Sequence, residues 1–503
     1  MENKTPETQE QSCSCGCSKK DFFNVKKSGS NVRTEIIAGI VTFLAMAYIL
    51  TLNPLLMLDM FNPNGTAHAH MYSSVFIATA LGAFIGTLLM ALYAKLPLAQ
   101  APGLGLNGMV GGLLGGGLIG TALSFGSSML LVLISGVLFL LLSILKIHGL
   151  SIREIIYKAI PESVRKAISV GIGLFIAIIG LANSGLIVAS STIVDLVPFS
   201  SWEMAVVGPA LVCLFGFIVI AVLSHFNIKG AVIIGILAAT LLGCIPAIGV
   251  TKMSEESWKF WLHFENFFSM DASKGGSFLA SFTDINFNGA SIFSLIMIVI
   301  TFCMIDMFDT MGTCVGCCSA AGLMTEDGVP VNYNRIMVAD SVATCTGALL
   351  GTSTVTTFVE SGAGIAAGGR TGLTALTTAC LFLLSIFLLP LFASIPGAAA
   401  ASALIWVGCL MLKGVKDLKV DTVKDLVPAF LTIAMMPFGY SITDGIGLGL
   451  LSYVIIDLCG YVFGLIGYAL SKKEDKVKPV WDLHVVTIII AVLFILYFFV
   501  PAK

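Results

Sequence analysis

Long apolar segments separated by short polar connections recur from Thr34 almost to the end of this 503-residue chain. An α-helix needs about 20 predominantly apolar residues to cross a bilayer, and most of the segments are of that order. Hydrophobic residues make up 57% of the chain and charged residues only 11%, a balance that soluble domains do not reach. We therefore predict an all-α polytopic membrane protein. The net charge of −2 gives no reason to expect a nucleic-acid partner.

The apolar segments form two sets of seven, separated by a polar stretch at 251–288 that mixes acidic and basic residues, as an external loop does. A further segment at 482–500 is long enough either to cross the membrane or to lie against the bundle. The chain is thus expected to have 14 transmembrane segments and an extra C-terminal apolar helix. The first set lies at roughly 34–57, 72–95, 98–118, 122–147, 165–184, 203–224 and 228–250, and the second at roughly 289–316, 335–351, 353–369, 371–394, 397–413, 426–441 and 443–468.

Basic residues gather after the even-numbered segments and in the polar tail at 1–33. Arg153 follows the fourth segment, Arg335 the eighth and Arg370 the tenth. Because connections rich in Lys and Arg stay on the cytoplasmic side, we expect a cytoplasmic N-terminus. The tail holds no apolar region of a secretory signal, so we predict a multi-pass protein of the cell membrane, either a plasma membrane or a bacterial inner membrane.

Thirteen cysteines are scattered through the chain, most of them in or beside apolar segments, where cysteine behaves as a small hydrophobe. Cys13, Cys15 and Cys17 lie together in the tail motif CSCGC, but no fourth ligand stands at the spacing of a zinc site. We predict no disulfide framework, no bound metal and no cofactor.

The two sets of seven segments resemble each other. VTFLAMAYIL (41–50) aligns with ITFCMIDMFD (300–309), and the Ile160-Pro161 pair before the fifth segment matches Ile395-Pro396 before the twelfth. An odd number of spans in each copy turns the second copy over in the membrane, as in many secondary transporters. The pattern predicts a 7+7 inverted repeat, and convergent packing of small residues between membrane helices is the alternative.

Two segments at corresponding places are too rich in Gly, Pro and Thr to be continuous helices. KLPLAQAPGLGLNGM (95–109) interrupts the first half, and GTSTVTTFVESGAGIAAGG (351–369) in the second half has a β-rich start followed by a stretch too short to span a bilayer. We predict two short discontinuous helices, each preceded by an extended strand. Irregular backbone at membrane depth is tolerated where it lines a cavity or is buried in protein, so we expect a shared pocket between them.

Three acidic residues stand where a membrane segment is otherwise uncharged. Asp306 and Asp309 are three positions apart, which places both carboxylates on one face of a helix, and Glu360 lies in the second interrupted segment. A charge at membrane depth costs about 2.5–3.5 kcal/mol on insertion scales, so such residues usually face a cavity, a partner or a substrate. Gln100 and Asn107 lie on the first interrupted segment and would face the acids across the pocket, so both are candidate substrate-binding residues.

Some of these residues also have a structural interpretation. Asp309 could hydrogen-bond Thr310 and Thr313 within its own helix, and Asn107 could fix a turn beside its glycines. Asp444, in SITDGIG, has the pattern of a helix N-cap between the thirteenth and fourteenth segments.

Four motifs carry a resemblance that extends from Thr34 to about Gly460: APGLGLN, DMFDTMGT, GALLGTSTVTTFVESGAGIAAGGRTGLTA and PAFLTIAMMPFGYSITDGIGLG. On these motifs the chain resembles the AzgA-like purine permeases of the nucleobase–cation symporter 2 family. The resemblance implies proton-coupled uptake of guanine, hypoxanthine or adenine. It places substrate binding on Asn107, Asp306 and Glu360, and a role in proton coupling on Asp309.

The resemblance also implies a division into a core domain and a gate domain that move against each other. The tail is 1–33, the core halves are 34–150 and 289–394, the gate halves are 151–250 and 395–468, the external loop is 251–288, and a basic loop with the last apolar segment is 469–503.

A purine base suits these residues because a carboxylate accepts two parallel hydrogen bonds from adjacent N–H groups, as guanine offers them. A transporter of another small polar solute or of an anion on the same fold is the alternative function. An enzyme is not expected, since an intramembrane aspartyl protease needs its two aspartates on different helices. The preferred purine, sodium in place of the proton, and a homodimer stay open at this point.

Overall fold

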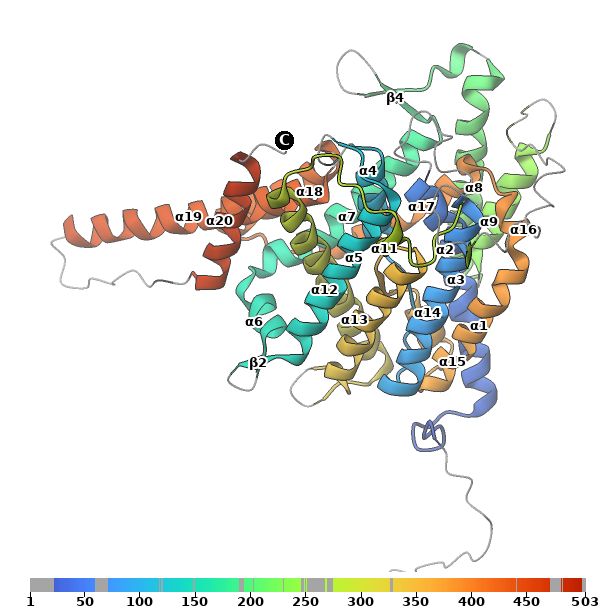
Figure 1. Ribbon diagram of the computed structural model, residues 1–503, viewed down its shortest axis with the longest axis horizontal. Coiled ribbons are helices and arrows are strands. Elements are labelled where there is room, and N and C mark those ends of the chain that lie inside the picture. Colours follow the sequence, from blue (N-terminus) through green and yellow to red (C-terminus); the bar gives the residue numbers. More distant parts are fainter. Residues whose placement is uncertain are drawn as a thin grey trace, which may run out of the picture.

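The structure is a computed structural model that describes the chain from residue 22 to residue 499, with gaps at 59–70, 117, 119–120, 148–149, 190–193, 202, 229, 246–247, 249, 251–266, 269–274, 326–328, 440, 471–480 and 482. The cysteine tail motif and most of the expected external loop lie outside the described residues. The remainder is a bundle of helices with three short pairs of strands (Figure 1).

Each predicted apolar segment contains at least one helix. The elements of the first half are α1 (Val32–Met46), α2 (Ile49–Leu58), α3 (Tyr72–Leu89), η2 (Met90–Ala94), β1 (Gln100–Pro102), α4 (Leu104–Leu114), α5 (Phe125–Ile144), β2 (Lys146–Ile147), β3 (Leu150–Ser151), α6 (Ile152–Ala159), α7 (Glu162–Asn183), β4 (Ile187–Ala189), β5 (Val194–Leu196), η3 (Phe199–Ser201), α8 (Met204–His225) and α9 (Ala231–Gly243). Those of the second half are α11 (Ala280–Thr283), α12 (Ile292–Ala321), α13 (Tyr333–Leu350), β6 (Val355–Thr357), α14 (Ser361–Ala366), α15 (Gly372–Ser385), η6 (Ile386–Leu388), α16 (Leu389–Ala393), α17 (Gly397–Met411), η7 (Leu412–Asp417), α18 (Val423–Phe438), α19 (Ile442–Leu470) and α20 (Val485–Phe499).

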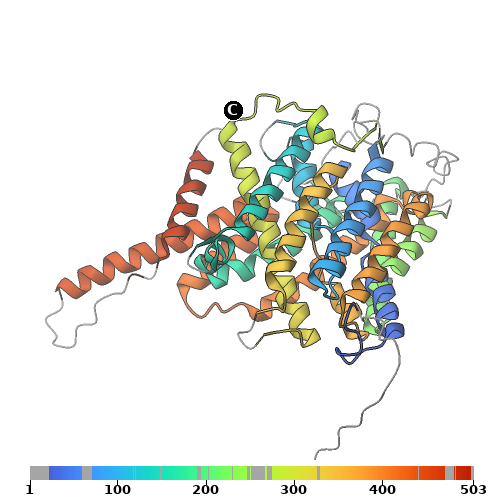
Figure 2. The ribbon, with the colours of Figure 1, turned by 60° about the horizontal axis from the view of Figure 1, so that its bottom comes forward.

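Among the described residues, nine helical stretches are long and apolar enough to cross a membrane. Three shorter apolar helices, α4, α9 and α20, lie in segments that we also predicted as apolar. The chain is therefore a multi-pass membrane protein. In Figures 1 and 2, α19 extends away from the other helices and is crossed by α20.

Two details of the helix boundaries differ from the sequence prediction. An additional helix, α6, occupies a stretch that we treated as part of a cytoplasmic connection, because its apolar and charged residues alternate too closely to form an apolar run. Asp444 is not the N-cap of α19: its own N–H donates to the hydroxyl of Ser441 over 3.2 Å, so Ser441 fills that place.

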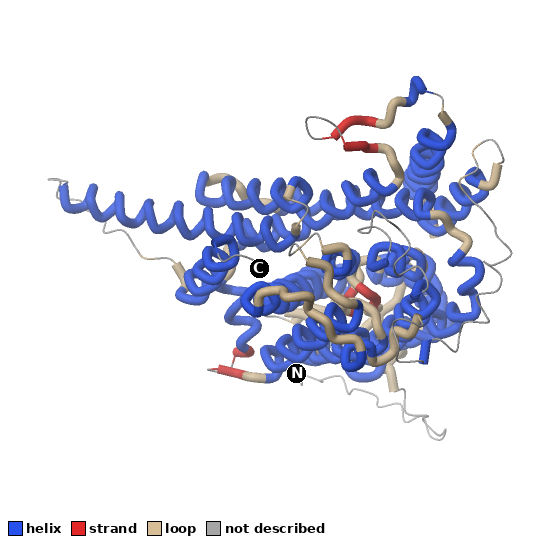
Figure 3. Tube along the Cα trace, turned by 45° about the horizontal axis from the view of Figure 1, so that its top comes forward, coloured by secondary structure: helices blue, strands red, loops and turns tan. Residues whose placement is uncertain are grey.

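The two predicted interruptions are present, and each has the expected strand before a short helix. In the first half, β1 precedes α4, and in the second half, β6 precedes α14. The two strands pair with each other in antiparallel register, with Gln100 opposite Thr357 and Pro102 opposite Val355. Pairing satisfies backbone groups that neither strand could satisfy alone at membrane depth. Figure 3 shows a short strand pair enclosed by helices, whereas the other strands lie at the edge of the molecule.

The helices sort into two packing groups. In the first packing group, α13 contacts α3 and α5, and α15 contacts α1 and α3. In the second packing group, α7 contacts α17 and α18, and α8 contacts α9 and α17. The two groups meet where α4 contacts α7, where α2 contacts α17 and where α1 contacts α9.

A buried acid on α1 anchors the C-terminal end of α14. Glu35 on α1 is fully buried and accepts hydrogen bonds from the backbone N–H of Arg370 at 3.0 Å and from the hydroxyl of Thr374 at 2.6 Å. The guanidinium of Arg370 donates in turn to the carbonyl oxygen of Ile365 at the end of α14. These contacts tie α14 to α1, so the short helix has a fixed support on the first packing group.

Candidate functional site

The crossing of β1 and β6 sets the geometry of the candidate site. The Gly103 N–H donates to the Thr354 carbonyl at 3.0 Å, and the Phe358 N–H donates to the Ala99 carbonyl at 3.0 Å. Helix α4 begins directly after Gly103, and α14 begins directly after Glu360. Both short helices therefore start beside the same strand pair, and α12 contacts β6 and both short helices.

Asp306 lies on α12 and is 1% exposed. Its Oδ2 accepts a hydrogen bond from the Thr344 hydroxyl at 2.7 Å, whereas its Oδ1 is buried with no hydrogen-bond partner among the described residues. Buried polar atoms in proteins are nearly always paired, so an unpaired carboxylate oxygen is a candidate acceptor for a ligand N–H.

Asp309 lies one turn further along α12 and is partly exposed, as is Glu360. The charges of these two residues are close enough to act on each other, and Asp306 interacts in the same way with Asp309. The hydroxyl of Thr310 donates a hydrogen bond to Asp340 Oδ2 at 2.7 Å. It also lies 2.7 Å from the hydroxyl of Thr356, within hydrogen-bond distance. Of the two hydrogen bonds in the structural interpretation of Asp309, the one with Thr310 is thus replaced by other partners of that hydroxyl, and the one with Thr313 stays a prediction.

Asn107 is fully buried on α4 and faces the strand pair. The hydroxyl of Ser353 donates to its Oδ1, and its Nδ2 has no partner among the described residues. The site thus holds an unpaired amide donor in addition to the unpaired oxygen of Asp306.

Gln100 has other partners than the expected ones. Its Nε2 donates to Asp340 Oδ1 at 2.6 Å and to the Thr357 hydroxyl at 3.3 Å, and its Oε1 points toward Gly86 of α3. Substrate contact by Gln100 stays a prediction. The observed hydrogen bonds show a structural role for Gln100, in which its amide fixes the position of the Asp340 carboxylate.

Asp340 and Tyr48 are polar residues at this place that the sequence does not single out. Asp340 is fully buried on α13 and accepts hydrogen bonds from Gln100, Thr310 and Thr357. Tyr48 lies between α1 and α2, and its hydroxyl donates to Glu360 Oε1 at 2.6 Å. An acid inside an apolar helix was a usable signal for Asp340, but nothing in the local sequence indicates the partner of Tyr48.

One side of the candidate site is open. Val359, next to Glu360, is 58% exposed, and a Cβ added at Gly312 or Gly362 would meet no atom within 4 Å. On the α4 side, by contrast, all eleven helical residues are buried. Asp309 and Glu360 therefore border accessible space, while Asp306 and the amide of α4 lie in packed protein.

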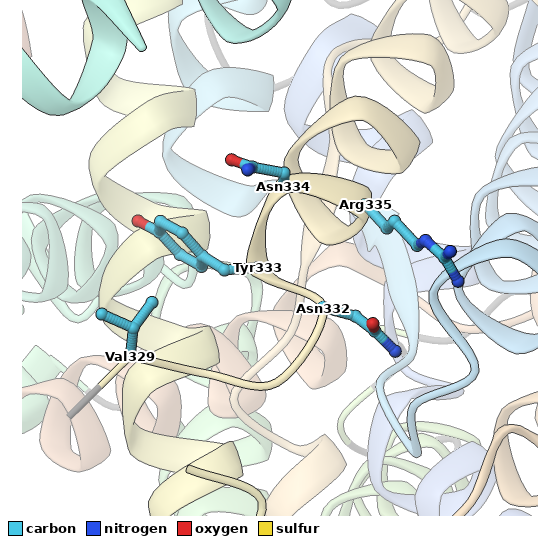
Figure 4. Close-up of a pocket in the computed structure, with 5 residues that line it drawn as sticks. All are labelled: Val329, Asn332, Tyr333, Asn334 and Arg335. Atoms are coloured by element: carbon cyan, nitrogen blue, oxygen red, sulfur yellow. The ribbon is translucent and has the colours of Figure 1, made fainter. Parts of the chain in front are cut away.

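A separate surface pocket lies at the start of α13, lined by Val329, Asn332, Tyr333, Asn334 and Arg335 (Figure 4). In Figure 4 the side chains of Asn334 and Arg335 point in different directions. No set of polar groups converges there, in contrast to the strand crossing.

Comparison with known proteins agrees with the class that the fold indicates. The sequence profile of the permease family matches residues 33–448. The chain is 36% identical to the guanine/hypoxanthine permease PbuG of Bacillus subtilis, over 95% of this chain and 99% of the relative. It is 35% identical to the adenine permease AdeP of Escherichia coli, over 87% of this chain and 89% of the relative.

Solved structures share the fold at low sequence identity. The transmembrane domain of the cyanobacterial bicarbonate transporter BicA is 16% identical and superposes with a TM-score of 0.56, over 82% of this chain and 97% of that domain. At this identity the likeness concerns the fold alone.

Proposed function

Because the chain belongs to the permease family, which moves solutes across membranes rather than converting them, we propose that it is a secondary active transporter that imports purine nucleobases by proton symport. The substrates are guanine, hypoxanthine or adenine. Two relatives support this substrate class, since one is named as a guanine/hypoxanthine permease and the other as an adenine permease.

The observation that carries the proposal is a set of buried polar atoms at the strand crossing that have no hydrogen-bond partner among the described residues, two of which are Asp306 Oδ1 and Asn107 Nδ2. They supply one hydrogen-bond acceptor and one donor, and Glu360 supplies further acceptor oxygens from the start of α14. A purine presents N–H donors and ring or carbonyl acceptors on one rigid plane, which matches such a set. The carboxylates at the site disfavour an anionic substrate.

Two buried phenylalanine rings belong to the same segments as the polar groups. Phe308 on α12 and Phe358 after β6 are 5% and 7% exposed. In the proposed complex, a base held at its edges by Asp306, Asn107 and Glu360 packs one face on such a ring, an arrangement that binds flat aromatic ligands well.

Proton coupling is assigned to the carboxylates as a group. Asp309 interacts through space with Asp306, Asp340 and Glu360, and Asp306 with Asp340, so a proton bound by one of these acids changes the affinity of its neighbours for a proton. Asp309 is the proposed coupling residue, because it is partly exposed and lies between Asp306 and Glu360 in this set of interactions. A proton taken up with the base on one side and released on the other couples uptake to the proton gradient.

The proposed architecture has 14 transmembrane segments in a 7+7 inverted repeat, with α20 in addition. The first packing group corresponds to the core domain (34–150 and 289–394), and the second to the gate domain (151–250 and 395–468). Alternating access then consists of motion between the two groups. The open side next to Val359 and the packed side at the α4–α7 contact fit a state that is open on one side only. The N-terminus is placed in the cytoplasm and the protein in the cell membrane.

Uptake of radiolabelled guanine, hypoxanthine, adenine, xanthine and uracil into cells without their own permeases tests the proposal. We expect purine uptake that rises at acidic external pH, collapses with a protonophore, persists without sodium, and is lost in Asp306→Ala and Glu360→Ala. Glu203→Gln, at an exposed acid, is the matched control. If none of the bases enters although the protein reaches the membrane, the substrate is another polar solute.

A further inference from the structure

Tyr48 is a buried polar residue that has no role in the proposed transport mechanism. It is 2% exposed and lies in the two-residue interruption between α1 and α2. The opening span of the chain therefore does not pass the site as one continuous helix. The interruption brings a phenol hydroxyl to the carboxylate at the start of α14.

The contact has the geometry of a strong hydrogen bond. The distance from Tyr48 Oη to Glu360 Oε1 is 2.6 Å, within the range of about 2.5–2.7 Å that is typical of a hydroxyl bonded to a carboxylate. Glu360 is the N-cap residue of α14, but its side chain makes no capping bond to its own helix. The carboxylate therefore accepts the Tyr48 hydroxyl without capping α14.

The backbone around this bond is held firmly on both sides. On the Tyr48 side, the Leu52 N–H donates to the Tyr48 carbonyl at 3.0 Å. On the Glu360 side, the Ala363 N–H donates to the Glu360 carbonyl at 2.9 Å. A hydrogen bond between two fixed backbones restricts the side-chain rotamers of Glu360, and Oε2 is the carboxylate oxygen that Tyr48 does not bind.

From this arrangement we infer that Tyr48 is a positioning residue for purine recognition: it fixes the Glu360 carboxylate so that Oε2 accepts an N–H of the base. The inference rests on the proposed function, in which Glu360 contacts the substrate. It adds a residue from the first half of the chain to a carboxylate of the second half. Without the hydroxyl, Glu360 must be ordered by each incoming base, and the cost of that ordering reduces affinity.

The test is Tyr48→Phe, which removes the hydroxyl and keeps the ring. Tyr93→Phe is the matched control, because Tyr93 is 46% exposed at the end of η2. Uptake of hypoxanthine and guanine is measured as a function of concentration, together with the amount of each protein in the membrane. We expect Tyr48→Phe to raise KM roughly tenfold with a maximal rate within about twofold of wild type, since hydrogen bonds to charged groups have that range of effect.

A second pair of variants separates positioning from a structural role. Purified wild type, Tyr48→Phe, Glu360→Gln and the double variant are compared by the concentration of hypoxanthine that protects them from thermal unfolding. If Tyr48 acts through Glu360, adding Tyr48→Phe to Glu360→Gln changes this concentration less than twofold.

The inference is overturned by an unchanged KM in Tyr48→Phe, by a fall in maximal rate alone, by loss of this variant from the membrane while Tyr93→Phe is retained, or by a full effect of Tyr48→Phe in the Glu360→Gln background. Those outcomes leave the proposed function intact. Failure of the proposed function is distinct, because wild type itself would then neither take up a purine nor be protected by one.

Discussion

The two strand–helix units of the site have the same local design and different surroundings. In the unit of β1 and α4, every residue of both elements is buried, and the polar group offered to the site is an amide, Asn107. In the unit of β6 and α14, only Ser361, Gly364 and Ile365 of the short helix are buried, and the polar group is the carboxylate of Glu360. One unit thus forms a packed wall with a neutral donor, and the other forms an accessible wall with an ionisable acceptor. In the proposed function, the two strand–helix units contribute different polar groups to one substrate site.

The largest effect is expected where the acceptor of the accessible unit is neutralised. Glu360→Gln, like Asp306→Asn on α12, keeps the size of the side chain and replaces an acceptor oxygen by an N–H₂ group that faces the donors of the base. We expect purine uptake to fall by about a hundredfold or more, because the lost bond is charged and the new contact is repulsive. Uptake rates normalised to membrane protein measure this, with Glu203→Gln as control. If Glu360→Gln takes up purines at nearly the wild-type rate, Glu360 does not bind the substrate.

A somewhat smaller effect is expected from packing beneath the same unit. In Gly364→Ala the new Cβ would lie 2.0 Å from Thr42 Oγ1 and 2.7 Å from the Ala38 carbonyl, so α14 must move away from α1. Gly362→Ala, two positions earlier, would meet no atom within 4 Å and is the matched control. We expect the first variant to lose roughly tenfold or more of its uptake and the second to stay within about twofold. Equal behaviour of the two variants would show that α14 is not held by α1 during transport.

Truncating Asn107 in the packed unit should reduce uptake less than neutralising Glu360 in the accessible unit. Asn107→Ala removes a neutral donor, and a neutral hydrogen bond contributes about half as much as a charged one. We expect KM for hypoxanthine to rise roughly five- to tenfold while the maximal rate changes little. Uptake measured as a function of hypoxanthine concentration gives both KM and the maximal rate. A loss as large as that of Glu360→Gln would contradict the division of labour between the two units.

The smallest effect on uptake is expected from Gln100→Leu. Its Nε2 is bound to Asp340, so its loss should lower stability by about 1–3 kcal/mol while KM changes less than about threefold. Thermal unfolding of the purified protein measures the loss of stability, and concentration-dependent uptake measures KM. A KM change as large as that of Asn107→Ala would instead support the substrate contact that the sequence suggested for Gln100.

Local sequence was sufficient to predict both interruptions, because glycine, proline and threonine act on the backbone where they stand. It also led to Asp306, Asp309 and Glu360, since a charge in an apolar run is conspicuous without any knowledge of the fold. The partners of these residues were not predictable in the same way. Tyr48 and Glu360 are 312 positions apart, and Gln100 and Asp340 are 240 apart, so only the packed bundle brings them together.

The residues that were misjudged have a related explanation. The sequence analysis does not select Asp340, although it is an acid in an apolar helix, because its three hydrogen-bond donors come from other segments and are not visible in the local sequence. Helix α6 was assigned to a connection because hydropathy averages out over its alternating charged and apolar residues. Ser441 and Asp444 are both good N-cap residues, and the sequence alone did not separate them.

The antiparallel pairing of β1 with β6 also has a consequence for biosynthesis. Gln100 and Thr357 are separated by 257 positions, so at a synthesis rate of about 5–20 residues per second roughly 10–50 seconds pass before the second strand follows the first out of the ribosome. During that interval the backbone of the first strand has no partner strand inside the membrane. A chain truncated before β6 should therefore be a substrate for membrane quality control, and the insertion machinery or a chaperone has to shield the nascent first half until the second arrives.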